Sequence, residues 1–317
     1  MVEYRTFRNG DPPAILSLWH GCGLGRGAAQ GVTQDAFDIS VYCQPYFDRG
    51  GLILAWDGDE AVGFVHAGFA ALPDGSGVDR SIGVVCAVMV RPDRRRQGVG
   101  RELLSRAEAY LRGRGAAAIK AGPSRGEDPF YFGLYGGARP SGFLESDAAA
   151  APFLAAAGYE PAKRVGVFQR NLSQGRDPTN FRIVSIRRKS ELAIADAPVD
   201  PSWWWYTHEA RFDTVRFRLM PKVGGGPESS SLTVIGLDCY LACWGERSVG
   251  LTDLFVAEEN RGKGYAQALV IEVIRRLRQE LVTRVEMHAP EESADVMKVV
   301  NACGFERVDT GVVYAKR

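Results

Sequence analysis

Two kinds of apolar pattern follow one another in a unit that occurs twice along the chain. Residues 84–90 and 251–256 are short apolar runs of the length and β-branched content typical of strands buried on both faces. A polar turn containing glycine follows each run, and apolar residues at helical spacing come next. They are Val99, Leu103, Leu104, Ala107 and Leu111 in the first copy and Leu269, Val270, Val273, Ile274 and Leu277 in the second. The pattern predicts a strand, a glycine-rich turn and an amphipathic helix, repeated once.

The two copies also continue alike after the helix. A strand is expected at 117–121 and at 284–288, and a short helix then ends at Gly158 in one copy and at Gly304 in the other. Glycine suits this position because the left-handed backbone that caps a helix disfavours most side chains. An aromatic residue follows each glycine, and the final strands are expected at 165–169 and 312–315.

Upstream of the repeated unit the halves differ. The first half is expected to contain strands at 4–7, 52–56 and 61–69 and helices at 12–23 and 34–42. The second half is abbreviated, with strands at 182–186, 214–219 and 232–243 and one helix at 189–195. The first half therefore has the more complete set of elements before its glycine turn.

A stretch with the composition of a linker joins the halves at 171–180, NLSQGRDPTN. The chain has 317 residues, which favours two domains at about 150 residues each. We expect these domains at 1–175 and 180–317. The first is 20 residues longer between its fifth strand and its last helix, and that segment includes Phe130, Tyr131 and Tyr135. Loops of this length within a domain are often functional.

The charge and cysteine patterns exclude several classes of function. Lysine and arginine total 39 against 38 acidic residues, so no excess positive field attracts nucleic acid or anionic lipid. The six cysteines form no CxxC pair and no paired Cys/His spacing, so reduced thiols are expected and no metal site. No apolar segment is long enough to span a bilayer, and the N-terminus lacks the apolar core of a signal peptide. These features predict a soluble, cytoplasmic protein.

The glycine turns suit a ligand that carries phosphate. A helix that begins at such a turn offers uncovered backbone N–H groups and the positive end of its dipole. Cations stand beside both turns: Arg91, Arg94, Arg95 and Arg96 in the first and Arg261 and Lys263 in the second. A Walker loop needs GxxxxGK[ST], and a dinucleotide fingerprint needs GxGxxG directly after its strand; neither fits. The turns therefore favour a diphosphate-bearing ligand of another class.

Both turns resemble the coenzyme A signature of the Gcn5-related N-acetyltransferase (GNAT) family, Arg/Gln-x-x-Gly-x-Gly/Ala. Residues 95–100 read RRQGVG and residues 261–266 read RGKGYA. With the flanking strands, helices and terminal glycines, the resemblance covers nearly the whole chain as two tandem GNAT folds. It implies an α/β (α+β) architecture in which each domain has a mixed, mostly antiparallel sheet, splayed between its fourth and fifth strands and flanked by helices. The second copy lacks part of the usual N-terminal helical region.

The resemblance also implies acetyl-CoA as the cofactor. Its pantetheine arm would pair with the end of the fourth strand, its diphosphate would bind at the glycine turn, and its thioester would lie at the splay. The residues that the resemblance assigns to cofactor binding are Val88, Met89, Val90, Arg95, Arg96, Gln97, Gly98, Val99, Gly100 and Arg101 in the first copy. In the second copy they are Leu254, Phe255, Val256, Arg261, Gly262, Lys263, Gly264, Tyr265 and Ala266.

The candidates for proton transfer are Tyr131, Tyr135 and Asp253. Many family members have a tyrosine four residues before the terminal glycine, where this chain has Leu154 and Val300. The two loop tyrosines are possible replacement acids, although pocket walls or packing are the alternative roles. Asp253, on the second copy's fourth strand, is a candidate base or a structural residue.

Three other features have packing as the expected role. His66 and His288 lie in strand patterns, where a histidine is more often packed than catalytic. The run of residues 203–206, WWWY, with His208 two positions further on, could bind an aromatic or cationic ligand or form an inter-domain core.

The resemblance implies an N-acetyltransferase in which the primary amine of a small-molecule acceptor attacks acetyl-CoA directly. We favour the first half as catalytic because its basic set is fuller and its aromatic loop could enclose an acceptor. One alternative is a degenerate pair that binds CoA or acyl-CoA as a sensor or scaffold. Another is a mycothiol-synthase-like enzyme that acts through its C-terminal half. The acceptor and the oligomeric state are left open.

Overall fold

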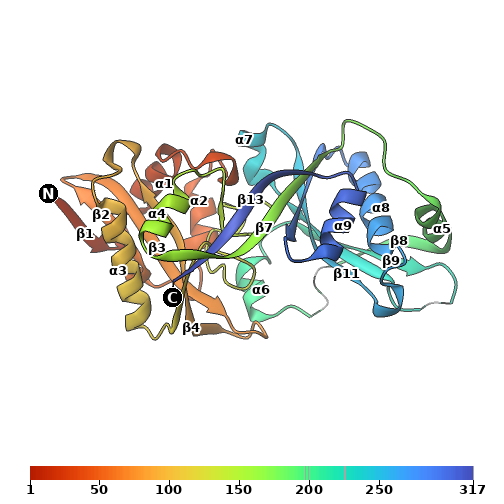
Figure 1. Ribbon diagram of the computed structural model, residues 1–317, viewed down its shortest axis with the longest axis horizontal. Helices are drawn as coiled ribbons and strands as arrows, with labels where there is room; N and C mark the ends of the chain where they lie inside the picture. The colour runs from red at the N-terminus through yellow and green to blue at the C-terminus, as the bar shows by residue number, and fades with distance from the viewer. Residues whose placement is uncertain (197, 199, 225, 317) are drawn as a thin grey trace. The chain divides into compact units, whose positions relative to one another are not determined.

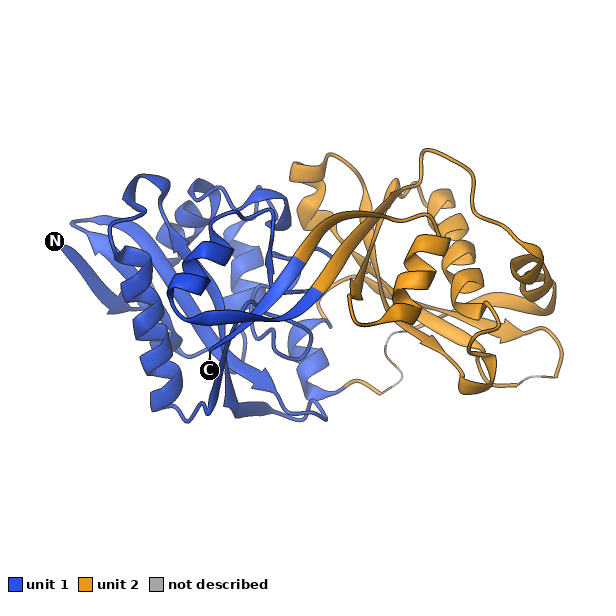
Figure 2. Cartoon of the chain, viewed as in Figure 1, with its two compact units in different colours: residues 1–164, 202–209, 311–317 blue, residues 165–201, 210–310 orange. Residues whose placement is uncertain are grey.

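The two copies of the strand, turn and helix pattern fold as expected, each in a unit of its own. The computed structural model describes residues 1–196, 198, 200–224 and 226–316. Unit 1 comprises Met1–Arg164, Ser202–Glu209 and Gly311–Arg317, and unit 2 comprises Val165–Pro201 and Ala210–Thr310 (Figure 2). The contiguous division expected at 1–175 and 180–317 differs from these units in three segments: 202–209 and 311–317 belong by contact to unit 1, and 165–175 belongs to unit 2.

Unit 1 is built on a sheet with the strand order β1-β2-β3-β4-β5-β13 (Figure 1). Its strands are β1 (Val2–Thr6), β2 (Leu52–Asp57), β3 (Glu60–Ala71), β4 (Val78–Val90), β5 (Ala118–Ala121), β6 (Phe143–Leu144) and the first part of β7 (Tyr159–Asn171). Its helices are α1 (Pro12–Gly21), α2 (Gln34–Phe37), α3 (Val99–Gly113), α4 (Ala150–Ala156) and α6 (Trp203–His208), with short turns η1 (Gly25–Gly27), η2 (Asp38–Tyr42), η3 (Arg49–Gly51) and η4 (Pro92–Arg94).

Unit 2 has the strand order β7-β12-β11-β10-β9-β8. Its strands are β8 (Ser190–Ala195), β9 (Thr214–Pro221), β10 (Ser230–Gly236), β11 (Ser248–Val256), β12 (Arg284–Pro290) and the first part of β13 (Glu306–Lys316). Its helices are α5 (Phe181–Lys189), α7 (Leu241–Trp244), α8 (Tyr265–Gln279) and α9 (Ala294–Ala302), with short turns η5 (Asp238–Tyr240) and η6 (Glu258–Asn260).

The helix after each glycine turn packs one face on the sheet of its unit. The apolar residues predicted from the helical spacing are buried in both α3 and α8. Burial of each such leucine stabilises the fold by about 2 kcal/mol. Each helix begins at a glycine with a left-handed backbone, Gly98 at φ +88° and Gly264 at φ +94°. Residues other than glycine rarely adopt this backbone conformation, so the position of the glycine fixes where each helix starts.

Each sheet splays at the same place. In unit 1 the parallel strands β4 and β5 pair from Ile82↔Ala118 to Val85↔Ala121, and β4 then continues without β5. In unit 2, β11 and β12 pair in parallel from Ser248↔Arg284 to Leu251↔Met287. The expected mixed sheet with a splay between its fourth and fifth strands is therefore confirmed in both units.

The end of β13 completes the sheet of unit 1. Tyr314 pairs with Ala121 of β5 in an antiparallel register. Gly142, at φ +89°, packs so closely on this strand that a Cβ atom there would overlap the backbone of Val312. Lys316 binds Glu108 of α3, with 2.8 Å from its Nζ to Oε2. The last residues of the chain are therefore part of the scaffold of unit 1.

Two secondary-structure predictions for the second half were wrong in type, and a third was wrong in its length. Residues 181–189, expected to begin with a strand, form α5, because Asn180 caps the helix by accepting a hydrogen bond from the Ile183 N–H at 3.0 Å. Residues 190–195, expected as a helix, form β8 and pair with β9. The strand expected over 232–243 ends at Gly236, and the chain then turns through η5 into α7.

The segment expected as a linker is anchored at Asp177. Its carboxylate binds Arg278 at 2.6 Å and Arg170 at 2.8 Å. Burial alone would raise the pKa of Asp177, but these two guanidinium groups hold it below its usual value. The connection between the halves is therefore fastened to the surface of unit 2.

Candidate functional site

The first glycine turn is held by an arginine that contacts backbone. Arg95 donates from Nε to the Val90 carbonyl at 3.0 Å and from Nη2 to the Cys22 carbonyl at 2.6 Å. Arg96 and Gly98 both have left-handed backbones, with φ +63° and +88°. The turn is thus tied to the end of β4 and to the residue after α1, and it leads directly into the first turn of α3, which no side chain caps.

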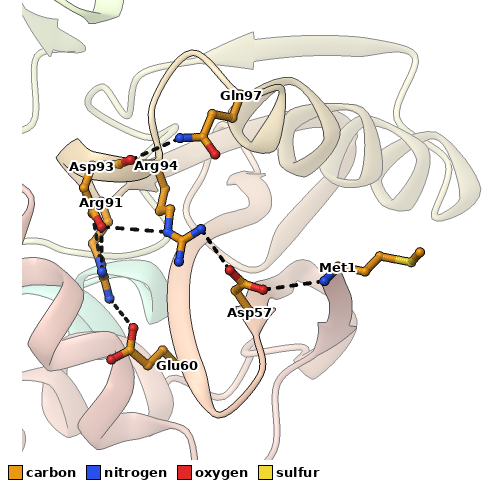
Figure 3. Close-up of polar contacts among 7 residues, drawn as sticks. All are labelled: Met1, Asp57, Glu60, Arg91, Asp93, Arg94 and Gln97. Atoms are coloured by element: carbon orange, nitrogen blue, oxygen red, sulfur yellow. Dashed lines mark hydrogen bonds and ion pairs between the residues drawn. The ribbon is translucent and has the colours of Figure 1, made fainter.

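Acidic residues neutralise two of the cations beside this turn (Figure 3). Arg91 binds Glu60 at 2.8 Å and Asp93 at 2.7 Å, and these hydrogen bonds raise the pKa of its guanidinium. Arg94 binds Asp57 at 2.9 Å. The charge that is left for a ligand therefore comes from other arginines.

A cavity of about 700 Å³ opens between the turn and α4, which is the size expected of a small-molecule or cofactor site. Arg96 and Arg101 line it, and neither forms an ion pair among the described residues. On the α4 side, Phe153 lies 3.2 Å from the position that a Cβ atom on Gly100 would take, so a larger residue there would narrow the cavity. Asp147 also lines this side.

Eight of the ten residues predicted for the first turn and strand end line this cavity: Val88, Met89, Val90, Arg95, Arg96, Gly98, Gly100 and Arg101. The other two point elsewhere. Gln97 donates to the Asp93 carbonyl at 3.1 Å, and Val99 is buried in the core under α3. The lining residues on α4 were not predicted, because the local motif carries no signal for a helix that lies 50 residues further along the chain.

The second turn has the same backbone design. Arg261 donates from Nε to the Val256 carbonyl at 3.3 Å, and Gly262 and Gly264 have left-handed backbones. Arg182 of α5 lies beside it, its Cβ 3.6 Å from where a Cβ on Gly264 would be. Lys263 and Arg182 are exposed, so two cations flank this turn.

Two further contacts distinguish the second copy. Gln267 donates to the Ala302 carbonyl at 2.9 Å and so ties α8 to the end of α9. The predicted cofactor residues of its strand end are Leu254, Phe255 and Val256, and the Phe255 side chain is largely exposed. Tyr265 and Ala266 form the first turn of α8.

A β-bulge lies at each splay. The register between β3 and β4 shifts so that Cys86 has no partner opposite it, and the register between β10 and β11 shifts around Asp253 and Leu254. Asp253 has a left-handed backbone at φ +53°. A bulge leaves a strand N–H outside the ladder, where it can donate a hydrogen bond to a carbonyl oxygen that gains negative charge.

Tyr131 and Tyr135 lie in the packed loop of unit 1 rather than on the cavity lining. Tyr131 is 2% exposed, stacks on Trp19 at 5.7 Å, and its hydroxyl lies 3.0 Å from His66 Nδ1. Burial raises the pKa of Tyr131 well above its ordinary value. Tyr135 accepts a hydrogen bond from the Leu144 N–H at 3.1 Å. This placement favours the packing role, and their role as acids stays a prediction.

The aromatic run of residues 203–206 and His208 belong to unit 1 through α6. Trp204 stacks on Tyr46 at 5.0 Å, and His208 Nδ1 lies 2.9 Å from the Tyr46 hydroxyl. Burial lowers the pKa of His208 to about 3 and raises that of the neighbouring Asp128 to about 8. This run therefore packs on the first half of the chain, with its histidine held neutral.

Asp253 and His288 lie in unit 2, on the two strands that splay. Asp253 accepts a hydrogen bond from Thr252 Oγ1 at 3.2 Å, and His288 Nε2 lies 2.9 Å from Glu286 Oε1. Glu286 was not among the predicted site residues. The alternation of Arg284, Glu286 and His288 with apolar residues could have shown that all three share one face of a strand.

The folded chain is a tandem protein in which one α/β fold occurs twice, each time with a glycine turn and a splayed sheet. The family description "Acetyltransferase (GNAT) family" matches it at residues 33–132 and 201–305, well over half of its length. The chain belongs to this family.

Similar proteins agree with this assignment. Mycothiol acetyltransferase from Geodermatophilus obscurus is 31% identical over 116 residues, which is 35% of this chain and 35% of that relative. The tandem GNAT protein from the clavulanic acid biosynthesis pathway has a TM-score of 0.67 at 17% identity, over 99% of this chain and 98% of that one. The GCN5-related glucosamine N-acetyltransferase region of a fungal GH3 β-N-acetylglucosaminidase has a TM-score of 0.71 at 18% identity, over 99% of this chain and 38% of that one. At these identities the structures share the fold.

Two other features bear on ligands. Within the described residues, no three or more His, Cys, Asp or Glu side chains are grouped so as to hold a metal ion. None of the described helices is long and apolar enough to cross a membrane.

Proposed function

We propose that the protein is an acetyl-CoA-dependent N-acetyltransferase that acetylates the primary amine of a small-molecule acceptor by direct attack. The observation that carries this proposal is the cavity of about 700 Å³ between the first glycine turn and α4. It adjoins the end of β4 and is lined by Arg96 and Arg101. We also propose a cytoplasmic location, because the cysteines show no paired spacing in the sequence and no disulfide joins them within the described residues.

The parts of the cavity match the parts of coenzyme A. Beyond Val85, the edge of β4 that faces β5 is unpaired, so the amides of a pantetheine arm can extend the ladder there. The uncapped N–H groups at the start of α3, with Arg96 and Arg101, can bind a diphosphate. Phe153 and the alanines of α4 form an apolar wall opposite the turn.

The reaction needs little from side chains. A neutral amine attacks the acetyl carbon, the carbon–sulfur bond breaks, and the thiolate leaves as the amine loses its proton. A bulge N–H can stabilise the negative oxygen while the bond changes take place. A base is needed only for the amine proton, because the thioester is already reactive.

The test is acetyl-CoA turnover with a panel of small amines, followed as free thiol. The panel includes glucosamine and other amino sugars, since one similar structure is described as a glucosamine N-acetyltransferase region. We expect thiol release above the hydrolysis background with at least one amine. In a thermal-shift assay, the apparent affinity of Gly98→Glu for CoA should be at least tenfold lower than that of the wild type. Gly115→Glu is the matched control, because Gly115 also has a positive φ and nothing within 4 Å.

The second candidate function is a CoA or acyl-CoA sensor or scaffold. The observation that favours it is the absence of a tyrosine at Leu154 and Val300, together with the burial of Tyr131. A protein of this kind would bind CoA and respond to Gly98→Glu, yet release no thiol with any amine of the panel. Amine-dependent thiol release excludes it.

A further inference from the structure

The two splays differ in the side chains that stand at them. In unit 1 the last parallel pair is Val85↔Ala121, and the next residues are Cys86 on β4 and Gly122 after β5. The backbone of Gly122 is left-handed, at φ +94°. In unit 2 the last pair is Leu251↔Met287, and the next residues are Thr252 and His288. Where unit 1 has a glycine and a buried thiol, unit 2 therefore has a hydroxyl and an imidazole.

The imidazole is held by a buried network. His288 Nε2 lies 2.9 Å from Glu286 Oε1, and Gln169 of β7 donates to Glu286 Oε2 at 2.6 Å. Arg284 reaches the Gln169 amide oxygen at 3.3 Å and binds Glu246 at 2.7 Å. Glu286 is 1% exposed. Because a carboxylate only accepts hydrogen bonds, Nε2 of His288 carries the proton and Nδ1 carries the lone pair.

The face on which these groups stand is the one that an acceptor would use. Val285, Met287 and Ala289 of β12 lie in the core cluster with α8. Since side chains alternate along a strand, Glu286 and His288 stand on the opposite face. A diphosphate at the start of α8 and an amine beside His288 would thus approach the splay from opposite faces of the sheet.

Two other features of an acyl-transfer site are also present in unit 2. The bulge at Asp253 lies directly after the last paired residues, so its strand N–H groups are at the splay. The second glycine turn, with Lys263 and Arg182 beside it, follows the same strand. One strand therefore connects a donor for the acetyl oxygen with a site for the diphosphate.

In unit 1 the corresponding face is filled. His66 is stacked 4.0 Å from Phe130, and Tyr131 packs against both His66 and Trp19. Gly68 is covered by Phe130 and Pro129, and a Cβ atom there would lie 2.7 Å from the Phe130 ring. These residues of the long loop take up the space in which an amine would meet a thioester at the first splay.

We propose that acetyl transfer takes place in unit 2, with His288 as the catalytic residue that accepts the amine proton and Glu286 as the residue that positions it. This inference rests on the proposed function and assigns the cofactor in unit 1 a binding role only. The amine nitrogen bonds to the acetyl carbon, the bond from that carbon to sulfur breaks, and the sulfur leaves with its electron pair. The amine proton passes to Nδ1 of His288, directly or through a hydrogen-bonded group, and then to solvent, from which the thiolate is protonated. The products are the amide and free CoA.

The first experiment separates the two units. Turnover and CoA stoichiometry are measured for Gly264→Glu and Gly98→Glu, with Gly175→Glu as the control in unit 2, since Gly175 also has a positive φ and nothing within 4 Å. We expect Gly264→Glu to lose more than 100-fold in kcat/KM while one CoA still binds. Gly98→Glu should lose the other CoA and lower kcat/KM by far less than Gly264→Glu does. The reverse pattern would leave the proposed function intact and overturn this inference.

The second experiment tests His288 itself. His288→Asn should lower kcat by 100-fold or more with KM for acetyl-CoA within threefold, and Glu286→Gln, which keeps a hydrogen-bond acceptor, should lower kcat about tenfold. Asp295→Asn, an exposed change on α9, is the control. A His288→Asn enzyme with the wild-type kcat would refute the assignment, whereas a wild type without turnover would refute the proposed function.

Discussion

Acidification should destabilise the chain through His66, and the structure gives the size of the effect. His66 is fully buried between Phe130 and Phe47, and burial lowers its pKa to about 3. In the unfolded chain a histidine has a pKa of about 6.5. The unfolded state therefore binds a proton below pH 6.5 that the folded state does not. Stability is complete above pH 6.5 and is lost progressively between pH 6.5 and 3.

The expected loss between pH 7.5 and pH 5.0 is about 2 kcal/mol for His66. His208 has the same lowered pKa, whereas Asp128 beside it has a pKa raised to about 8. Because the folded state keeps a proton on Asp128 that the unfolded chain loses above its usual pKa of about 4, Asp128 gains about 3 kcal/mol of stability between pH 7.5 and 5.0, which opposes the loss from the histidines. His208 should add about 2 kcal/mol more to that loss. The two buried histidines together should therefore cost about 4 kcal/mol at pH 5.0.

The assay is urea unfolding at pH 7.5 and 5.0, followed by tryptophan fluorescence, for the wild type, His66→Asn and His20→Asn. The quantity compared is the difference in the free energy of unfolding between the two pH values, so the baseline cost of each substitution cancels. His66→Asn should show a difference smaller by about 2 kcal/mol than that of the wild type. The exposed His20→Asn should leave it unchanged. If His66→Asn kept the full wild-type difference, the burial argument would be wrong.

Two more predictions concern the strand that closes unit 1. Lys316→Met should destabilise the chain by about 1–2 kcal/mol, because Glu108 would lose the nearer of its two cations and keep Arg112 at 3.6 Å. The pair is partly exposed, so the cost is below that of a fully buried one. Chemical denaturation should show a smaller effect of Lys316→Met in a Glu108→Gln background, and equal effects in both backgrounds would exclude the ion pair as the cause. Gly142→Ala should cost more than 3 kcal/mol, because its Cβ would overlap the backbone of β13. Gly126→Ala shares the positive φ but has open space around it, so thermal denaturation should show a loss of only about 1 kcal/mol.

The parts of the fold that the sequence predicted are those whose signals are local. A buried strand, a glycine turn and an amphipathic helix are each encoded within about 30 consecutive residues, and both copies are confirmed. The errors at 181–195 have the opposite cause. Six to nine residues with a few apolar positions suit either a helix or a strand, and the Asn180 cap and the pairing with β9 decide between them.

The candidate site likewise has a part that a local sequence motif predicts and a part that depends on contacts between distant segments. The residues of the first turn and strand end were predicted because the motif is contiguous, and eight of them line the cavity. The network of His288, Glu286 and Gln169 could not be predicted, because it depends on the pairing of β7 with β12, which are more than 100 residues apart. The membership of α6 and the end of β13 in unit 1 likewise depends on contacts between distant segments.

The 20 additional residues of the first half have a different consequence from the one that their composition suggested. As a loop of aromatic residues and glycines, they indicated a wall around an acceptor. In the folded chain, Phe130 and Tyr131 pack against His66 on the sheet face opposite α3, and Gly122 replaces a side chain at the splay. The second half lacks this loop and has Thr252, Asp253 and His288 at its splay. In this duplicated fold, the insertion buries aromatic rings in one copy and packs them on the sheet face at its splay. We therefore propose transfer in the copy without the insertion.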